Sequence, residues 1–150
     1  MYEERLENAY EELKRVDHLI YVSLKYTRTC DVLKNTVSRL IACLDFIFDC
    51  YLQKAEEQHK IFEIPQSPMI KAMEFKKLFQ EDKQIEQMVN MYILLRKINR
   101  AEYKKSNEFR RYVTMHMTID EKEVNLDIDT ISQYYKDTKG YIEYIKGLNK

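Results

Sequence analysis

The residue types best suited to chemistry are concentrated between residues 110 and 116. Arg111 and His116 are separated by four residues, and Arg110 adds a second guanidinium group. An arginine can hold a phosphate, and a histidine can move protons near neutral pH. Such a pair suits RNA cleavage without a metal, because the 2′-hydroxyl attacks its own phosphate once a base removes its proton. The alternative is that the arginines are solvated and that His116 is a polar residue on the outer face of a strand.

A run of basic residues leads up to this segment. Within residues 96–111 only Glu102 and Glu108 are acidic, and the basic residues are Arg96, Lys97, Arg100, Lys104, Lys105, Arg110 and Arg111. Tyr103, Phe109 and Tyr112 lie between or beside them. Cations that follow a sugar–phosphate backbone, with aromatic rings that stack on bases, are typical of nucleic-acid-binding surfaces. The alternative is a helix that ends in favourable cations and continues as a solvated loop.

Neither a metal nor a cofactor is predicted. The side chains that bind metals do not occur at ligand spacing, and Asp45 with Asp49 is interpreted as a solvated helix face. Only two glycines occur in the chain, which excludes a glycine-rich nucleotide loop. We expect Cys30, Cys43 and Cys50 to be free, buried thiols. Cys43 and Cys50 are seven residues apart on one predicted helix, so ~10 Å separates their Cα atoms, too far for a disulfide.

Helices must position these residues, because Gly and Pro occur only twice each and few turns can interrupt the chain. Apolar residues that recur every three or four positions predict helices over 3–24, 31–60, 67–80, 83–101 and 129–148. Asp31 is expected to cap the second helix, and Ser67 followed by Pro68 marks the start of the third. Asp129 or Thr130 is expected to begin the last one.

The apolar period changes from that of a helix to two between residues 112 and 128. Thr114 and His116 alternate with Met115 and Met117, and the alternation resumes after the polar residues 120–123. This pattern predicts a β-hairpin. Because an isolated hairpin is marginally stable in water, its apolar side should pack on the helices. His116 then lies on the polar, outward side.

The helical pattern together with the Arg111-x4-His116 spacing resembles the HEPN superfamily of helical bundles. The resemblance covers roughly residues 3–100 by pattern and includes two long antiparallel helices followed by a shorter pair. Two stretches are similar to small archaeal HEPN-like proteins, VDHLIYV at 16–22 and LKNTV at 33–37. The resemblance implies a metal-independent ribonuclease with Arg111 and His116 as catalytic residues. It equally implies an inactive partner protein or an RNA-binding module.

One feature departs from the pattern of active HEPN enzymes. Their motif sits at a helix start and usually has a small polar residue after the arginine, whereas Tyr112 follows Arg111 here and the segment is predicted as strand. The resemblance therefore implies a copy that has lost catalytic activity.

These observations together predict one mainly α-helical domain over residues 1–150. The expected fold is an antiparallel bundle of about five helices with a short β-hairpin before the C-terminal helix. Our first hypothesis is a non-catalytic, HEPN-like interaction module that binds RNA or a protein partner. The alternatives are a ribonuclease that uses Arg111 and His116, and a structural subunit of a larger complex.

Partners and location follow from composition. The chain carries 25 basic and 25 acidic residues, so no overall charge favours nucleic acid or a membrane. The last helix contains Tyr134, Tyr135, Tyr141 and Tyr144, and tyrosine is enriched at protein interfaces, so we expect a homodimer. With no leader peptide and no apolar run of membrane-spanning length, a cytoplasmic location is expected.

Overall fold

The computed structural model describes residues 2–148. Helices predominate in it, as predicted. The elements in chain order are α1 (Tyr2–His18), the π-helix η1 (Leu19–Ser23), α2 (Leu24–Tyr26), α3 (Cys30–Glu57), α4 (Pro68–Leu78), α5 (Lys83–Arg100), β1 (Lys104–Ser106), β2 (Thr114–Ile119), β3 (Lys122–Asp127) and α6 (Ile128–Leu148).

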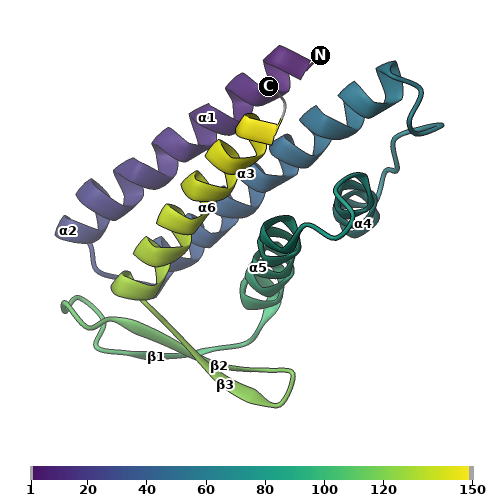
Figure 1. The fold of residues 1–150 in the computed structure, drawn as a ribbon. Coiled ribbons are helices and arrows are strands. Elements are labelled where there is room, and N and C mark those ends of the chain that lie inside the picture. The colour runs from purple at the N-terminus through teal and green to yellow at the C-terminus, as the bar shows by residue number, and fades with distance from the viewer. Residues whose placement is uncertain (1, 149–150) are drawn as a thin grey trace.

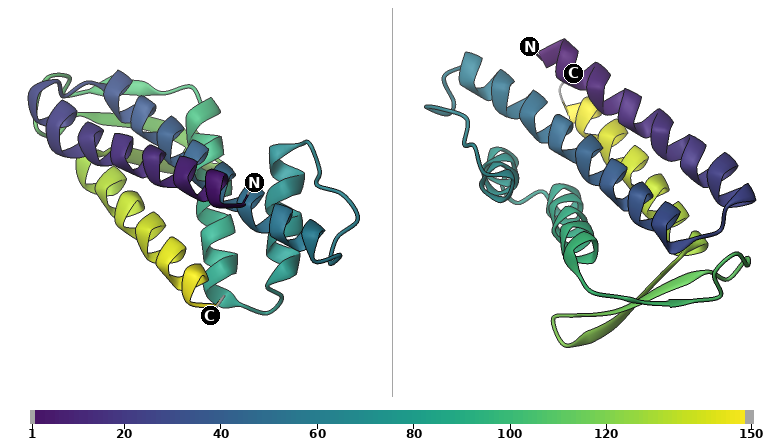
Figure 2. Two further views of the ribbon diagram at one scale, coloured as in Figure 1. Left: turned by 90° about the horizontal axis from the view of Figure 1, so that it is seen from above. Right: turned by 180° about the vertical axis from the view of Figure 1, so that it is seen from behind.

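The helices form two groups with different directions. α1 runs antiparallel to α3, whereas α6 runs alongside them in the same direction as α3 (Figure 1). α4 and α5 lie across α3 at a steep angle, and the sheet closes one end of the helical body (Figure 2). A single antiparallel bundle, as expected from the apolar periodicity, is therefore not confirmed. Periodicity identifies the buried side of each helix but not the angle at which two helices cross.

α3 is the centre of the molecule and contacts α1, α4, α5 and α6. Its Phe48 ring lies 4.6 Å from that of Phe75 on α4 and 4.9 Å from that of Tyr92 on α5, centroid to centroid. All three residues are fully buried. α3 is therefore packed on more than one side, and these rings explain how the crossing helices are held on it.

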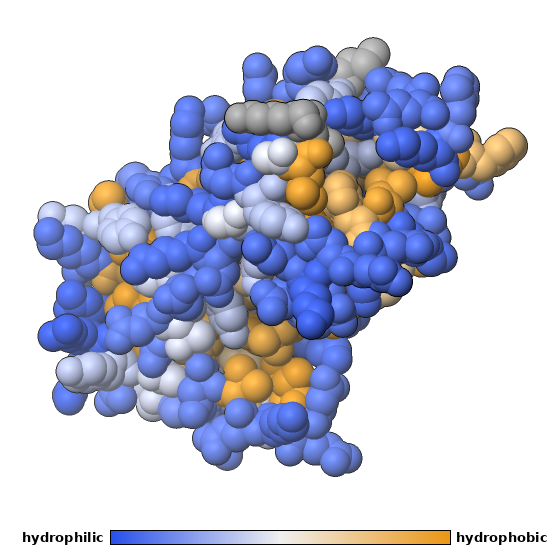
Figure 3. Space-filling view, in the orientation of Figure 1, coloured by the Kyte–Doolittle hydropathy of each residue, from blue (hydrophilic) through white to orange (hydrophobic). Residues whose placement is uncertain are grey.

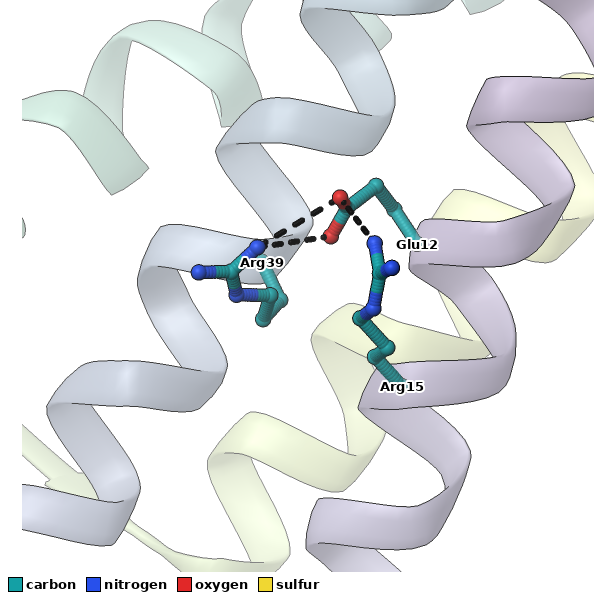
Figure 4. A network of polar contacts seen from close by, with 3 residues as sticks. All are labelled: Glu12, Arg15 and Arg39. Carbon is teal, nitrogen blue, oxygen red and sulfur yellow. Dashed lines mark hydrogen bonds and ion pairs between the residues drawn. The ribbon is translucent and has the colours of Figure 1, made fainter.

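A buried carboxylate joins α1 to α3. Glu12 is only 5% exposed, yet its carboxylate accepts hydrogen bonds from Arg15 at 2.6 Å and from Arg39 at 3.3 Å (Figure 4). A buried charge is tolerated when it is paired and hydrogen-bonded. The two guanidinium groups, one from each helix, therefore allow an acidic residue to lie within an otherwise apolar helix contact.

α3 begins two residues earlier than the predicted cap implies. Thr29, not Asp31, is the N-cap, and its hydroxyl accepts a hydrogen bond from the Val32 amide at 3.3 Å. Glu108 satisfies a second amide, because its carboxylate accepts from the Cys30 N–H at 3.1 Å. The prediction that Asp31 caps this helix is wrong. Which of the neighbouring polar residues becomes the N-cap depends here on a contact with a distant loop, the one that contains Glu108.

The starts of α4 and α6 test two further predictions. α4 begins at Pro68 with Ser67 before it, as predicted, although the Ser67 side chain makes no capping hydrogen bond. α6 is capped by Asp127, whose carboxylate accepts from the Thr130 amide at 2.8 Å. Asp129 therefore lies inside the first turn of α6, after the residue that caps it.

The sheet has three antiparallel strands in the order β1-β2-β3, one more than predicted. Met115 and Leu126 face the helices and are fully buried, so the expected apolar side does pack inward. β2 and β3 are joined through Asp120 and Glu121, both at positive φ (50° and 67°), as the tightest hairpin turns require. The extra strand, β1, comes from within the predicted basic run.

The three cysteines are buried and free, as predicted. Burial is the main cause that raises the pKa of Cys30 to about 11 and that of Cys50 to about 12, and it raises the pKa of Cys43 further. They are protonated near neutral pH and act as small core residues. Among residues 2–148, no helix is both long enough and apolar enough to cross a membrane.

The tyrosines of α6 are held by contacts inside the chain. Tyr135 is buried and donates a hydrogen bond to Asp17 at 2.8 Å, and Tyr144 donates to Asp82 at 2.6 Å. Tyr134 and Tyr141 are partly buried against the core. Intramolecular packing thus accounts for the rings on which a homodimer was predicted, and the dimer stays a prediction.

Candidate functional site

His116 lies on β2 with both ring nitrogens engaged. Its Nε2 is 2.6 Å from the Ser106 hydroxyl on β1, and its Nδ1 is 2.8 Å from Oδ1 of Asn125 on β3. The ring therefore joins all three strands on the outward face of the sheet. This is the predicted side of the strand, although the two polar partners were not foreseen.

Arg111 occupies a different place. It is exposed in the turn before β2, and its guanidinium group stacks on the Tyr112 ring at 5.7 Å from the centroid. It lines a cavity of about 330 Å³ whose other lining residues do not include His116. Arg111 and His116 therefore have separate surroundings. The Arg-x4-His spacing suggested that they share one site, but His116 does not line this cavity.

The basic run is divided by the fold. Arg96 is partly buried on α5 beside Tyr92, with its Nη1 3.4 Å from the Tyr92 hydroxyl. Lys97 forms an ion pair with Asp120 at 2.6 Å. These cations serve the core and the β2–β3 turn, so they contribute little to a shared binding surface.

The remaining cations of the run also separate. Lys105 pairs with Glu108 at 3.5 Å, and the charges of Asp31 and then Glu108 raise the pKa of Lys105. Arg100 and Lys104 are exposed at the end of α5 and on β1. Arg110 and Arg111 are exposed together in the loop between β1 and β2. Of the seven predicted nucleic-acid-binding residues, these two lie beside exposed aromatic rings.

The end of the first helical segment also presents aromatic residues beside this loop. The π-helix η1 contains one extra residue per turn, a distortion that is frequent at functional sites. Tyr21 is the middle residue of η1 and is 52% exposed, and Tyr26 ends α2 with 78% of its surface exposed. Lys25 and Arg28 accompany these rings. The apolar pattern placed Tyr21 inside the helix predicted over 3–24, and it assigned no function to residues 25–28, which lie between the first two predicted helices.

The loop between β1 and β2 is tied to the start of α3. The Phe109 amide donates a hydrogen bond to the Arg28 carbonyl at 2.6 Å, and Glu108 caps α3. Asn107 and Phe109 have positive φ (56° and 66°), a backbone conformation that costs free energy in residues other than glycine. The loop is thus fixed in place while the Phe109 side chain is 76% exposed.

These two segments form one surface, which we call the aromatic end. It consists of Tyr21, Lys25, Tyr26, Arg28, Phe109, Arg110, Arg111 and Tyr112. Five of these residues, Tyr21, Lys25, Arg28, Arg111 and Tyr112, line the cavity, which also has an apolar wall from Ile20, Leu24 and Ile128, with Asp127 and Asp129 at the start of α6. The buried Nε of Arg28 has no hydrogen-bond acceptor within residues 2–148. Exposed rings, strained backbone and cations that form no ion pair with another residue of 2–148 coincide here.

The carboxylates considered for a metal have protein partners. Asp45 accepts a hydrogen bond from the Tyr92 hydroxyl, and burial raises the pKa of Asp45. Asp49 forms an ion pair with Lys71 at 2.9 Å. Both are partly buried, so they are not a solvated face as predicted. In the described part of the chain, no group of three or more potential metal ligands comes together.

Sequence reasoning missed half of the aromatic end because its rings come from the periphery of a helical pattern. Tyr21 and Tyr26 fall at positions that widen an apolar stripe, and only the fold shows that they remain outside the core. Comparisons with protein-family models, with curated proteins and with solved structures each returned no match. Any functional interpretation therefore rests on the geometry of the chain itself.

Proposed function

We propose that this protein is a HEPN-like, non-cleaving RNA-binding module that holds single-stranded RNA on the aromatic end. One observation carries the proposal: Tyr26, Phe109 and Tyr112 are exposed by 78%, 76% and 68%, and they lie among the cations of the aromatic end. Phe is among the residue types most often buried, Tyr is intermediate, and a group of exposed rings marks a binding surface more often than a single one does. Rings held outside by a fixed backbone are available to a ligand.

The chemistry of this surface matches single-stranded RNA in two respects. Stacking of a base on an aromatic side chain contributes roughly 1–3 kcal/mol and tolerates any sequence. Arg110 and Arg111 can hold phosphates, and the stack of Arg111 on Tyr112 orders both groups before RNA arrives. Binding that combines these contacts should be sensitive to salt and largely insensitive to sequence.

One feature supports binding without cleavage. Arg111 lines a cavity whose lining residues do not include His116, so the two proposed catalytic groups do not face one shared site. The antiparallel α1–α3 pair supports the HEPN-like part of the proposal. Cleavage through Arg111 and His116 is the alternative that the experiment below distinguishes.

A second candidate, a subunit of a larger protein complex, is favoured by one apolar area. Phe62 is 98% exposed in the segment that joins α3 to α4, and Ile70 on α4 is 54% exposed. Figure 3 shows apolar side chains gathered on this side of the molecule, with one projecting group. A protein partner or a second copy of the chain would bury this area.

The test is retention of a labelled single-stranded RNA by the pure protein, measured in EDTA over a range of salt concentrations. We expect the wild type to retain RNA without cleaving it. The double variant Phe109→Ala with Tyr112→Ala should bind at least about 30-fold more weakly, since two lost stacks of roughly 1–3 kcal/mol each sum to at least about 2 kcal/mol. Phe62→Ala is the matched control, because it removes an exposed ring outside the aromatic end.

Three outcomes would contradict the proposal. If Phe62→Ala weakened RNA binding as much as the double variant does, RNA binding would not be specific to the rings of the aromatic end. Cleavage in EDTA that His116→Ala abolishes would establish the ribonuclease alternative. Absence of retention at low salt would favour the protein-complex candidate, which predicts an assembly that Phe62→Ala disrupts in analytical ultracentrifugation with candidate partners.

A further inference from the structure

The outward face of the sheet carries a row of three polar side chains, one from each strand. Ser106 on β1, His116 on β2 and Asn125 on β3 are joined by contacts of 2.6 Å and 2.8 Å. The row lies apart from the cavity of the aromatic end. The row joins a hydroxyl to an imidazole and the imidazole to an amide. Enzymes that use a serine or cysteine nucleophile have the same order of groups: the nucleophile, its base, and a third group that orients the base.

The hydrogen-bonding capacities of its neighbours select one tautomer for the neutral His116 ring. The Asn125 Oδ1 can only accept, so the His116 Nδ1 carries the proton and donates it. The neutral imidazole then has its lone pair on Nε2, which accepts from the Ser106 hydroxyl. This tautomer is the one in which histidine can remove a proton from serine.

The register of the strands shows that Ser106 and His116 are not directly opposite each other. Ser106 pairs with Thr114, and His116 pairs with Lys104, so the serine–histidine contact is diagonal. Lys104 therefore lies opposite the imidazole on the same face, with about 4.5–5.5 Å between Cβ atoms. Asn107, the residue after Ser106, has a positive φ of 56°. Strained backbone next to a potential nucleophile is a feature of functional sites.

We infer that Ser106 is a reactive nucleophile that takes up an acyl group from an ester, with His116 as its base, Asn125 as the positioning residue and Lys104 as the cation beside the developing oxyanion. The face is open, which suits an ester carried on an extended or surface-bound substrate. This activity is independent of RNA binding and uses none of the residues of the aromatic end.

The reaction balances with water as the only co-reactant. The Ser106 proton passes to His116 Nε2 while Oγ forms a bond to the ester carbonyl carbon. The carbon–oxygen bond to the alcohol then breaks, and the alcohol leaves with the proton from His116. Water attacks the acyl group with the same base, which regenerates Ser106 and releases a carboxylic acid.

The test is covalent labelling of the full chain with an alkyl fluorophosphonate, followed by peptide mass spectrometry. An activated serine forms an oxygen–phosphorus bond and expels fluoride, while the base takes the proton. We expect an adduct on Ser106, none in Ser106→Ala, and labelling at least about 100-fold slower in His116→Ala, the usual contribution of a positioned base. Asn125→Asp should label faster, because a carboxylate stabilises the imidazolium that forms.

Controls separate reactivity from a structural role. Ser67→Ala removes another exposed hydroxyl and should leave the labelling rate unchanged. If the row only joins the strands, Ser106→Ala and His116→Ala will lower the unfolding temperature, and neither the wild type nor Asn125→Asp will be labelled at Ser106. That result, or a rate unaffected by His116→Ala, overturns the inference, whatever the outcome of the RNA experiment.

Discussion

Around the middle of α3, large aromatic rings are fully enclosed, whereas at the aromatic end rings of the same kind are held outside. Phe48 and Tyr92 are 0% exposed and contact each other, while Phe109 is 76% exposed beside arginines. Burial of a large ring stabilises the fold by roughly 1.5–3 kcal/mol. A ring that remains exposed forgoes that contribution, so the comparison separates side chains that build the fold from those available to a ligand.

The backbone differs between the two regions in the same sense. Through the α3 core the chain is regular helix, whereas the aromatic end includes residues of a π-helix and the positive-φ residue Phe109, with Asn107, also at positive φ, just before it. Each such residue costs about 1–3 kcal/mol. The core therefore supplies the stability that holds the aromatic end in an unfavourable geometry. Mutations in the core should lower the free energy of unfolding and leave RNA affinity unchanged, whereas mutations in the aromatic end should weaken RNA binding with little loss of stability.

The largest effect should come from breaking the core. Phe48→Ala leaves a cavity between Phe75 and Tyr92 and should lower the free energy of unfolding by about 3–5 kcal/mol, measured by urea denaturation. RNA affinity of the fraction that remains folded should be unchanged. A loss of affinity in fully folded protein would mean that the two regions are coupled and that the comparison fails.

An intermediate effect on stability is expected at the start of α5, the helix that carries Tyr92 into the core. The Asp82 carboxylate accepts from the Gln84 and Ile85 amides at 3.0 and 3.1 Å and from the Tyr144 hydroxyl at 2.6 Å. Asp82→Ala should cost about 1 kcal/mol at pH 7, the usual value of an N-cap. Glu81→Gln, which changes an exposed neighbouring charge, is the control and should leave stability unaltered.

The same residue gives a pH dependence of known sign. The Tyr144 hydrogen bond is the main cause that lowers the pKa of Asp82 below its usual value of about 4. A lowered pKa in the folded state contributes stability above pH 4, and the contribution is lost as the pH falls through the folded-state value. The stability difference between the wild type and Asp82→Ala should therefore shrink between pH 5 and pH 2 in urea titrations; a difference that grows would contradict this origin.

The smallest expected effect is an increase in the free energy of unfolding, and it distinguishes the two regions most directly. Phe109→Gly relieves a positive φ and should raise the free energy of unfolding by about 0.5–1 kcal/mol while RNA binding weakens. Glu81→Gly is the matched control, because Glu81 also has a positive φ (65°) but lies between α4 and α5. It should gain similar stability with unchanged RNA affinity. Equal binding by both variants would remove Phe109 from the proposed surface.

The sequence predicted best what depends on local pattern. The helix expected over 83–101 ends at Arg100, and α4 begins at Pro68 as its Ser-Pro start indicates. The apolar alternation around Met115 identifies the buried side of β2. In each case hydrophobic period or a capping residue carries the information, and both are written in neighbouring positions.

What the sequence did not reveal depends on distant contacts. β1 has three polar residues and no alternation, so it becomes a strand only because β2 lies beside it. The contact between Ser106 and His116 needs the register of that unpredicted strand. Glu108 looked like a minor acidic residue in a basic run, and only the fold places its carboxylate at the start of α3.

The contact between Glu108 and the Cys30 amide joins residues 78 positions apart. During synthesis α1 and most of α3 leave the ribosome long before residue 108 exists, so the first turn of α3 must wait for its second cap. Closing so long a loop is slow compared with helix formation. The aromatic end should thus be the last part of the nascent chain to reach its final shape, and unfinished chains would lack the surface on which RNA binding is proposed.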